Sequence, residues 1–281
     1  RDDPEGMMEG PADRSVDVFR RRSGGVGPGF ERIGSGEIGG KATGLVFLRD
    51  HVVSRIDASR FAGIEFEIPR TVVIGTGVFE SFVKLNGLDG SALDGRSDAW
   101  IAHVFQRANM PPTVVGDLHA LIRGQRRPLA VRSSSRLEDA LDHPFAGVYG
   151  TKMLPNNQTD SQTRFRRLIE AIKFVYGTTW MQAARSYHRS LGNDVGDEAM
   201  AVVLQEVVGR LHGPRFYPDL SGVARSWNPY PLPGTSTGDG VAREDRIRGP
   251  ALLGRKPTGL SPWPSASPSP CAAAPPPWSP V

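Results

Sequence analysis

Two short segments combine residue types that suit phosphate binding. Gly39-Gly40-Lys41 places two glycines and a lysine where a short helix should begin, so free backbone N–H groups and an ammonium would face an anion together. Arg132-Ser133-Ser134-Ser135 places a guanidinium and three hydroxyls after a short apolar strand, Leu129-Ala130-Val131. The alternatives are an ordinary helix-entry turn at the first segment, and pairing of Arg132 with Glu138 or Asp139 at the second.

A third segment, Phe145 to Thr151, carries glycines at 147 and 150 among small residues. Glycine lets a backbone approach a ligand closely, although a plain β-hairpin turn would have the same composition. The segment is therefore a candidate ligand loop on composition alone.

Standard nucleotide motifs are matched only in part. Residues 34–39 satisfy G-x-G-x-x-G, but the preceding Phe30-Glu31-Arg32-Ile33 is a poor apolar strand, which that fingerprint requires. A P-loop is a near miss, because Ser35 takes its first glycine position and Ala42 stands where Ser or Thr would bind Mg²⁺. Both standard nucleotide folds are disfavoured.

Several classes of protein are excluded by composition. A single cysteine, Cys271, rules out a disulfide framework, and the six histidines show no metal-ligand spacing. There is no G-x-S-x-G hydrolase motif, and no apolar run approaches the roughly 18 residues that a membrane span needs. We expect no membrane association and a cytoplasmic location.

The net charge of +4 gives little support for nucleic-acid binding. Residues 249–281 hold two basic residues and no acid, so the remainder of the chain is close to neutral. The arginines cluster at three places, Arg20-Arg21-Arg22, Arg126-Arg127 and Arg164 with Arg166 and Arg167. They show neither aromatics interleaved on a sheet nor a recognition-helix motif, so they are typical of solvated faces. No nucleic-acid partner is expected.

The central part of the chain alternates helical and strand patterns, which predicts an α+β body. Glycine, proline and apolar periodicity set these elements: a helix opening at 39–41; a buried strand at 71–74; a helix at 100–108 stopped by Pro111-Pro112; a helix from 164 with a break at Gly177; a strand at 200–208 with 220–224 as its hairpin partner.

Three regions follow from composition. Residues 1–29 read as a disordered leader, and a start at Arg leaves a fragment or processed chain open. Residues 30–248 form the predicted domain, with lobes of roughly 30–110 and 111–248. Residues 249–281 hold ten of the 24 prolines and read as a disordered Pro/Ser/Ala-rich tail.

Taken in order, these segments resemble the N-terminal ATP-binding domain of the phosphoenolpyruvate synthase and pyruvate phosphate dikinase family. The resemblance covers about Phe30 to Ala242 and rests on the following residues: Gly39-Gly40-Lys41-Ala42, Val131-Arg132-Ser133-Ser134 with Glu138-Asp139, Phe145-Ala146-Gly147, Arg185-Ser186-Tyr187, Val202 to Val208, and Ser221-Gly222-Val223 ending in Asn228-Pro229.

The resemblance implies an ATP-grasp-like fold that closes two lobes over ATP and Mg²⁺. By that resemblance, Lys41 and Arg132 contact the phosphates, and the backbone from Gly147 to Thr151 forms a flexible phosphate loop. The main chain of Gln205, Glu206, Val207 and Val208 would read the adenine edge. Arg132 is the candidate catalytic residue, and no residue is assigned to a metal. A phosphohistidine domain and an acceptor-binding domain are the implied partners.

Departures from the family pattern predict an incomplete C-terminal part. Ala224-Arg225-Ser226-Trp227 replaces a Phe-Thr pair, and the family's later Gly-Leu-Gly-Glu, Glu and Gln-x-Arg segments are missing before Val281. By the resemblance, the later Glu and the Gln-x-Arg hold Mg²⁺ and the γ-phosphate, so we expect poor transfer by the isolated chain. Two functions stay open: a dikinase-type phosphotransferase acting on pyruvate or another acceptor, and a catalytically dead nucleotide-binding or partner-docking module. A frame-shifted tail would explain the truncation.

Overall fold

The computed structural model describes residues 16–21, 29–88, 90–135, 147–192 and 198–245. They fall into two compact units, which divide between Val207 and Val208. The sequence-predicted lobe boundary near residue 110 lies inside the first unit, because one sheet draws strands from both sides of it. The lobe assignment stays a prediction, and the predicted tail from 249 lies outside the described residues.

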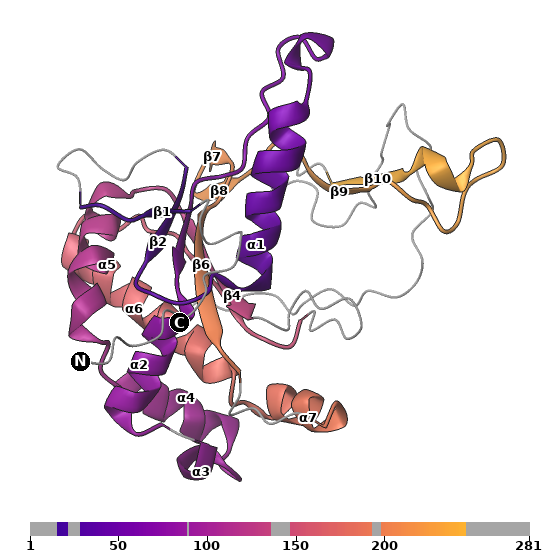
Figure 1. Ribbon diagram of the computed structural model, residues 1–281. Helices are drawn as coiled ribbons and strands as arrows, with labels where there is room; N and C mark the ends of the chain where they lie inside the picture. The colour runs from indigo at the N-terminus through magenta and orange to yellow at the C-terminus, as the bar shows by residue number, and fades with distance from the viewer. Residues whose placement is uncertain (1–15, 22–28, 89, 136–146, 193–197, 246–281) are drawn as a thin grey trace, which may run out of the picture. The chain divides into compact units, whose positions relative to one another are not determined.

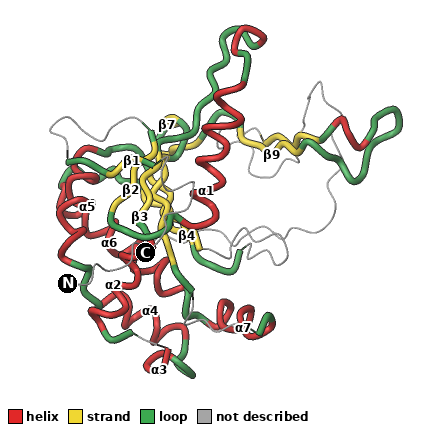
Figure 2. The backbone as a smooth tube through the Cα atoms, viewed as in Figure 1, coloured by secondary structure: helices red, strands yellow, loops and turns green. Residues whose placement is uncertain are grey.

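A six-stranded mixed sheet forms the centre of the first unit, in the order β1-β2-β3-β6-β4-β5 (Figures 1 and 2). The strands are β1 (Asp17–Val18), β2 (Phe30–Ile33), β3 (Thr71–Ile74), β4 (Leu129–Ser135), β5 (Thr151–Leu154) and β6 (Met200–Glu206). β1, β2 and β3 are parallel, whereas β6 runs antiparallel to both of its neighbours, β3 and β4.

Helices cover both faces of this sheet. On one face lies α1 (Gly39–Phe47), which continues as a π-helical turn (Leu48–Val52) and a 3₁₀ turn (Val53–Arg55). The helical layer on the other face packs on β4, β5 and β6 (Figure 1). The helices of the first unit besides α1 are α2 (Thr76–Asn86), α3 (Gly90–Leu93), α4 (Asp98–Arg107), α5 (Pro112–Gly124), α6 (Ser161–Thr178) and α7 (Gln182–Ser190).

The two faces of the sheet bury different apolar residues. Strand alternation sends Val73, Ala201 and Val203 toward α1, where Ala42 and Val46 meet them. Neighbours such as Val72 and Val202 point into the larger core against α2, α4, α5 and α6. The α+β prediction is confirmed, and the two-sided burial explains why β6 reads as an almost continuous apolar run.

The structure corrects two sequence predictions about strands near the N-terminus. Val16 and Phe19, assigned to a disordered leader, are buried in the two cores, and β1 between them pairs with β2. Phe30–Ile33, interpreted as a poor strand, is β2, and all four of its residues are buried. Two buried charged residues, Glu31 and Arg32, interrupt the apolar pattern that would have indicated it.

The described residues of the second unit, 208–245, form two separate hairpins and a 3₁₀ turn at Thr237–Asp239. β7 (Arg210–His212) pairs with β8 (Arg215–Tyr217), and β9 (Ser221–Arg225) pairs with β10 (Val241–Asp245). The prediction that 220–224 pairs with the 200–208 strand is therefore wrong. A strand has two edges, and both edges of β6 are already taken by β3 and β4.

Candidate functional site

The segment with the G-x-G-x-x-G spacing connects β2 to α1, and the chain then returns through β3 parallel to β2. This strand–loop–helix context is the one that a dinucleotide fingerprint requires. The remaining context differs, because β6 next to β3 is antiparallel and Gly75-Thr76, not an acidic residue, follows β3. The dinucleotide interpretation thus fails on the sheet around the motif.

The N-terminus of α1 lies directly against the end of β4, which brings the two sequence-predicted phosphate motifs together. The Ser134 hydroxyl accepts a hydrogen bond from the Ala42 N–H at 3.1 Å and donates one to the Ile38 carbonyl at 2.9 Å. The Lys41 ammonium donates to the Ser133 hydroxyl at 3.3 Å. A lysine, a helix start and buried hydroxyls therefore meet at one point of the sheet.

Gly39 explains how the helix and the strand can approach so closely. Its φ is +74°, in the left-handed region that favours glycine. A Cβ placed on Gly39 would overlap the carbonyl oxygen of Ser134 in β4. The glycine therefore has a structural role, as the helix-entry alternative predicts.

Arg132 lies in β4 on the same side of the strand as Ser134, because residues two apart share a face. It is half-buried and stands opposite Thr151 of β5 and Val203 of β6. Among the described residues its guanidinium has no hydrogen bond or ion pair. The alternative partners Glu138 and Asp139 lie outside the described residues, so that alternative stays open.

The predicted phosphate loop runs from Gly147, whose φ is +80°, to Thr151 at the start of β5. The loop is anchored by Tyr149, whose buried hydroxyl lies 2.9 Å from Nε2 of His188 and 3.0 Å from a carboxylate oxygen of Glu198. The His188 and Glu198 side chains are 1% exposed and lie 3.4 Å apart. This buried network ties the loop to α7 and to the residues before β6.

Sequence reasoning missed the three members of this network. They are separated by 39 and 10 residues in the chain and show no motif spacing, so nothing local indicates them. The burial of His188 is typical of a histidine that packs within the protein. The network adds a fixed point within the predicted loop.

The predicted adenine-reading segment occupies the end of β6 and the two residues after it. The Glu206 N–H donates to the Arg70 carbonyl and the Val207 N–H to the Pro128 carbonyl, each at 2.9 Å. Val208 is 54% exposed, and its N–H has no partner among the described residues. The main chain is thus held by the protein as far as Val207 and is open at Val208.

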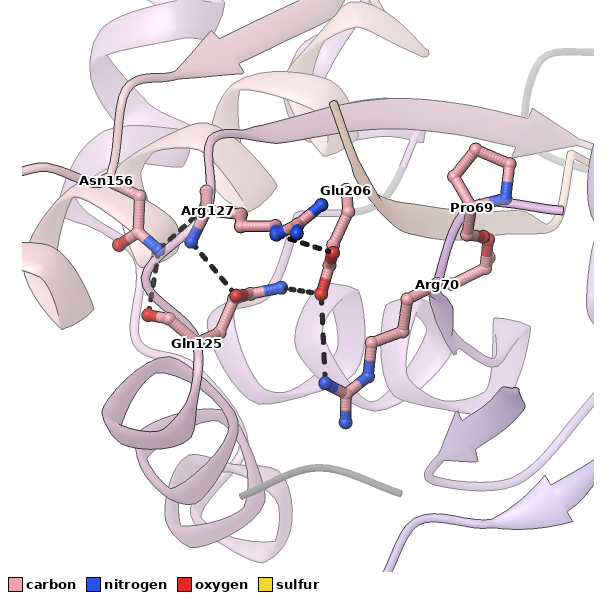
Figure 3. Close-up of polar contacts among 7 residues, drawn as sticks. Pro69, Arg70, Gln125, Arg127, Asn156 and Glu206 are labelled. Carbon is pink, nitrogen blue, oxygen red and sulfur yellow. Dashed lines mark hydrogen bonds and ion pairs between the residues drawn. The ribbon is translucent and has the colours of Figure 1, made fainter. Parts of the chain in front are cut away.

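A polar cluster holds the Glu206 side chain, as Figure 3 shows. The Arg70 and Arg127 guanidiniums approach its carboxylate from different sides, at 3.7 and 3.8 Å, and the Gln125 amide donates to the carboxylate between them. Asn156 donates to the carbonyls of Gln125 and Arg127 at 2.9 and 3.0 Å. The Glu206 side chain therefore turns into the protein, which leaves only its main chain for a ligand.

Arg132 and Glu206 lie at different points along the β4–β6 pairing. Arg132 stands opposite Val203 in the middle of the pairing, whereas Glu206 comes three residues later and stands opposite Leu129 at one end. At a rise of about 3.4 Å per residue, the separation is about 10 Å. The separation suits one extended ligand with an anionic end and a flat polar end.

Within the described ranges, no group of three or more His, Cys, Asp or Glu side chains is arranged to hold a metal ion. The helices of the described residues also include none that is long and apolar enough to cross a membrane. A scan against models of protein families matches residues 35–247 to the pyruvate phosphate dikinase AMP/ATP-binding domain. A search of curated proteins gave no match.

Proposed function

Since this chain belongs to the pyruvate phosphate dikinase AMP/ATP-binding domain family, we propose that it binds ATP along the β4–β6 strand pair. The observation that carries the proposal is the meeting of Lys41 and the hydroxyls of β4 at the N-terminus of α1. Helix N-termini and cations both favour phosphate, and the two occur here together.

At the phosphate end, Lys41 and Arg132 supply two positive charges. Arg132 forms no ion pair with the described residues, so its guanidinium is available for a bidentate contact with phosphate oxygens. Thr151 stands directly opposite it, at the end of the loop that begins at Gly147. We assign the backbone of this loop to the terminal phosphates.

At the base end, the backbone after β6 supplies the contacts. The N–H of Val208 is open, and the N–H groups of Glu206 and Val207 are used within the protein. We therefore assign the Val208 N–H as the donor to the adenine ring. The Glu206 carbonyl is assigned as the acceptor from the exocyclic amine of adenine. Gln205, whose amide donates to the Thr71 hydroxyl at 3.1 Å, fixes the strand beneath them.

In the family reaction we infer for the complete enzyme, a phosphoryl group passes from ATP to a histidine of a separate domain and then to pyruvate or another acceptor. Here Arg132 and Lys41 would orient the phosphate chain and offset the negative charge that develops on the transferred group. The buried network at Tyr149 would hold the loop in place over that group. An ATP-grasp-like closure of two lobes belongs to the same proposal.

Mg²⁺ accompanies ATP in phosphoryl transfer and neutralises phosphate charge when bound. The described side chains at this end of the sheet are a lysine, an arginine and hydroxyls, which do not make up a set of magnesium ligands. The described residues therefore do not fit the ion. We assign Mg²⁺ no protein ligand and no role in the steps proposed for phosphoryl transfer.

Isothermal titration of the 281-residue chain with ATP, with and without Mg²⁺, tests the site. Lys41→Ala and Arg132→Ala should each weaken binding about tenfold, since each removes one charge-assisted contact. Lys84→Ala and Arg107→Ala, which remove exposed cations of α2 and α4, are the matched controls and should bind as the parent does. Unchanged heats in both site variants would contradict the assignment.

The second candidate function is a nucleotide-binding or docking module without transfer activity. It is favoured by the lack of a carboxylate set for Mg²⁺ among the described residues. Detection of phosphohistidine on an added carrier domain, or ATP turnover by this chain alone, would rule it out. ATP binding without either would support it.

A further inference from the structure

A cavity of about 510 Å³ lies beside α6, on the face of the sheet opposite α1. Its walls come from β5 and the segment after it, from α6, and from α4 through Gln106. Lys152 opposite Val131 in the β4–β5 register points to this face, and its ammonium lies 4.6 Å from the centre of the Phe174 ring. The cavity is thus separate from the proposed ATP site, across the sheet.

The lining of this cavity is strongly cationic. Lys152, Arg164 and Arg167 line it with a single carboxylate, Glu170. The Arg167–Glu170 pair is 3.8 Å apart with both side chains at least half exposed, so it offsets little of the positive charge. Lys152 has no ion pair among the described residues.

Arg164 is the most unusual member of the lining, because it is 1% exposed and has no carboxylate partner among the described residues. Its guanidinium donates to three carbonyls, those of Gln158, Thr159 and Ile122, at 2.8 to 3.2 Å. Its Nε has no partner, and burial lowers the pKa of the group. Asp160 attracts this cation but forms no ion pair with it, so an anion in the adjacent cavity would further offset the cost of burying the charge.

Asn156 adds a polar acceptor to the same wall. Its amide nitrogen donates to the carbonyls of Gln125 and Arg127. These two bonds identify the nitrogen end of the amide, so the other end is the oxygen. The remaining oxygen is buried and has no partner, and the residue has a φ of +54°. An unpaired buried acceptor beside a cationic cavity suits a hydroxyl donor.

We propose that this cavity binds a small organic anion that also carries a hydroxyl group, with its carboxylate or phosphate toward Lys152, Arg164 and Arg167 and its hydroxyl toward Asn156. The two anion classes share this chemistry. Because Lys152 follows Thr151 directly, the same short strand forms a wall of the cavity and ends the proposed phosphate loop.

Titration of the full chain with inorganic phosphate, glycerol 3-phosphate, malate and glycerol tests the proposal. We expect glycerol 3-phosphate or malate to bind with a Kd of about 1 mM or below, more tightly than phosphate, and glycerol not to bind. Lys152→Ala should weaken binding about tenfold through loss of a charge-assisted contact. Arg166→Ala, which removes a neighbouring cation of α6 that does not line the cavity, is the matched control and should change little.

Two further variants separate this site from the nucleotide site. Lys41→Ala should leave glycerol 3-phosphate or malate binding intact, whereas loss of binding in that variant would assign the anion to α1 and overturn the proposal. Equal weakening in Lys152→Ala and Arg166→Ala would show unspecific attraction and overturn it as well. So would the absence of binding by all the anions at 10 mM, about tenfold above the expected Kd. Asn156→Asp, which places a carboxylate beside the cavity, should abolish anion binding, with circular dichroism confirming that the variant folds.

Discussion

Substitution of Gly39 by alanine should loosen the junction between α1 and β4. A non-glycine residue at a φ of +74° costs about 1 to 2 kcal/mol. The new Cβ would also overlap the backbone oxygen of Ser134, and relief of such overpacking costs about 1 to 3 kcal/mol. We therefore expect Gly39→Ala to lower the free energy of unfolding by about 2 to 5 kcal/mol, a large part of the about 5 to 15 kcal/mol of an ordinary domain.

The same helix offers the matched control. Gly44 is exposed in the middle of α1, and no atom lies within 4 Å of a Cβ placed there. Gly44→Ala should therefore stabilise the protein by about 0.5 to 1 kcal/mol, because alanine loses less backbone entropy in a helix. The same glycine-to-alanine substitution, made at two positions five residues apart, should thus change the free energy of unfolding in opposite directions.

Urea unfolding followed by circular dichroism measures both variants, and ATP titration follows the functional consequence. Gly39→Ala should weaken ATP binding because it moves the α1 N-terminus and Lys41 away from β4, whereas Gly44→Ala should not. A Gly39→Ala protein as stable as the parent, or a Gly44→Ala protein equally destabilised, would refute the close approach as we describe it.

Three other substitutions test contacts around the site. Tyr149→Phe should cost about 1 to 3 kcal/mol in urea unfolding, since it leaves His188 and a buried carboxylate without their shared hydroxyl; no loss would contradict the network. Glu206→Gln should cost a similar amount because two neighbouring arginines lose a carboxylate, and a neutral result would show that solvent screens the cluster. The pKa of Asp160 is lowered, chiefly by a hydrogen bond from the side chain of Thr163, so its stabilisation is present above about pH 4 and is lost as the pH falls through the lowered value. Asp160→Asn should remove this acid-range loss in unfolding curves from pH 5 to 2, and an unaltered pH profile would count against the cap.

Local sequence pattern predicted the elements that carry the site but not their partners. The glycine-lysine turn opens α1, and the apolar run before Arg132 is the start of β4, as expected from residue type and period. The contact between them joins Ala42 to Ser134, 92 residues apart. Since such a contact depends on sheet order, no local spacing could have indicated it.

The wrong predictions have equally physical causes. The 220–224 segment has a strand pattern, but pattern does not say which edge a strand finds, and the edges of β6 were already taken. Phe30–Ile33 was rejected because two charged residues interrupt it, although tertiary structure buries both. The two residues of β1 are too few to show a period at all.

The backbone contacts at the end of β6 also set a sharp boundary in local stability. The N–H groups of Glu206 and Val207 are bonded on opposite sides of the strand, to β3 and β4 neighbours, whereas the next N–H is open. The protection of the amides against hydrogen exchange should therefore fall from high at Val207 to nearly none at Val208. A bound adenine would extend protection to Val208, so this single amide would report occupancy of the base end without any label.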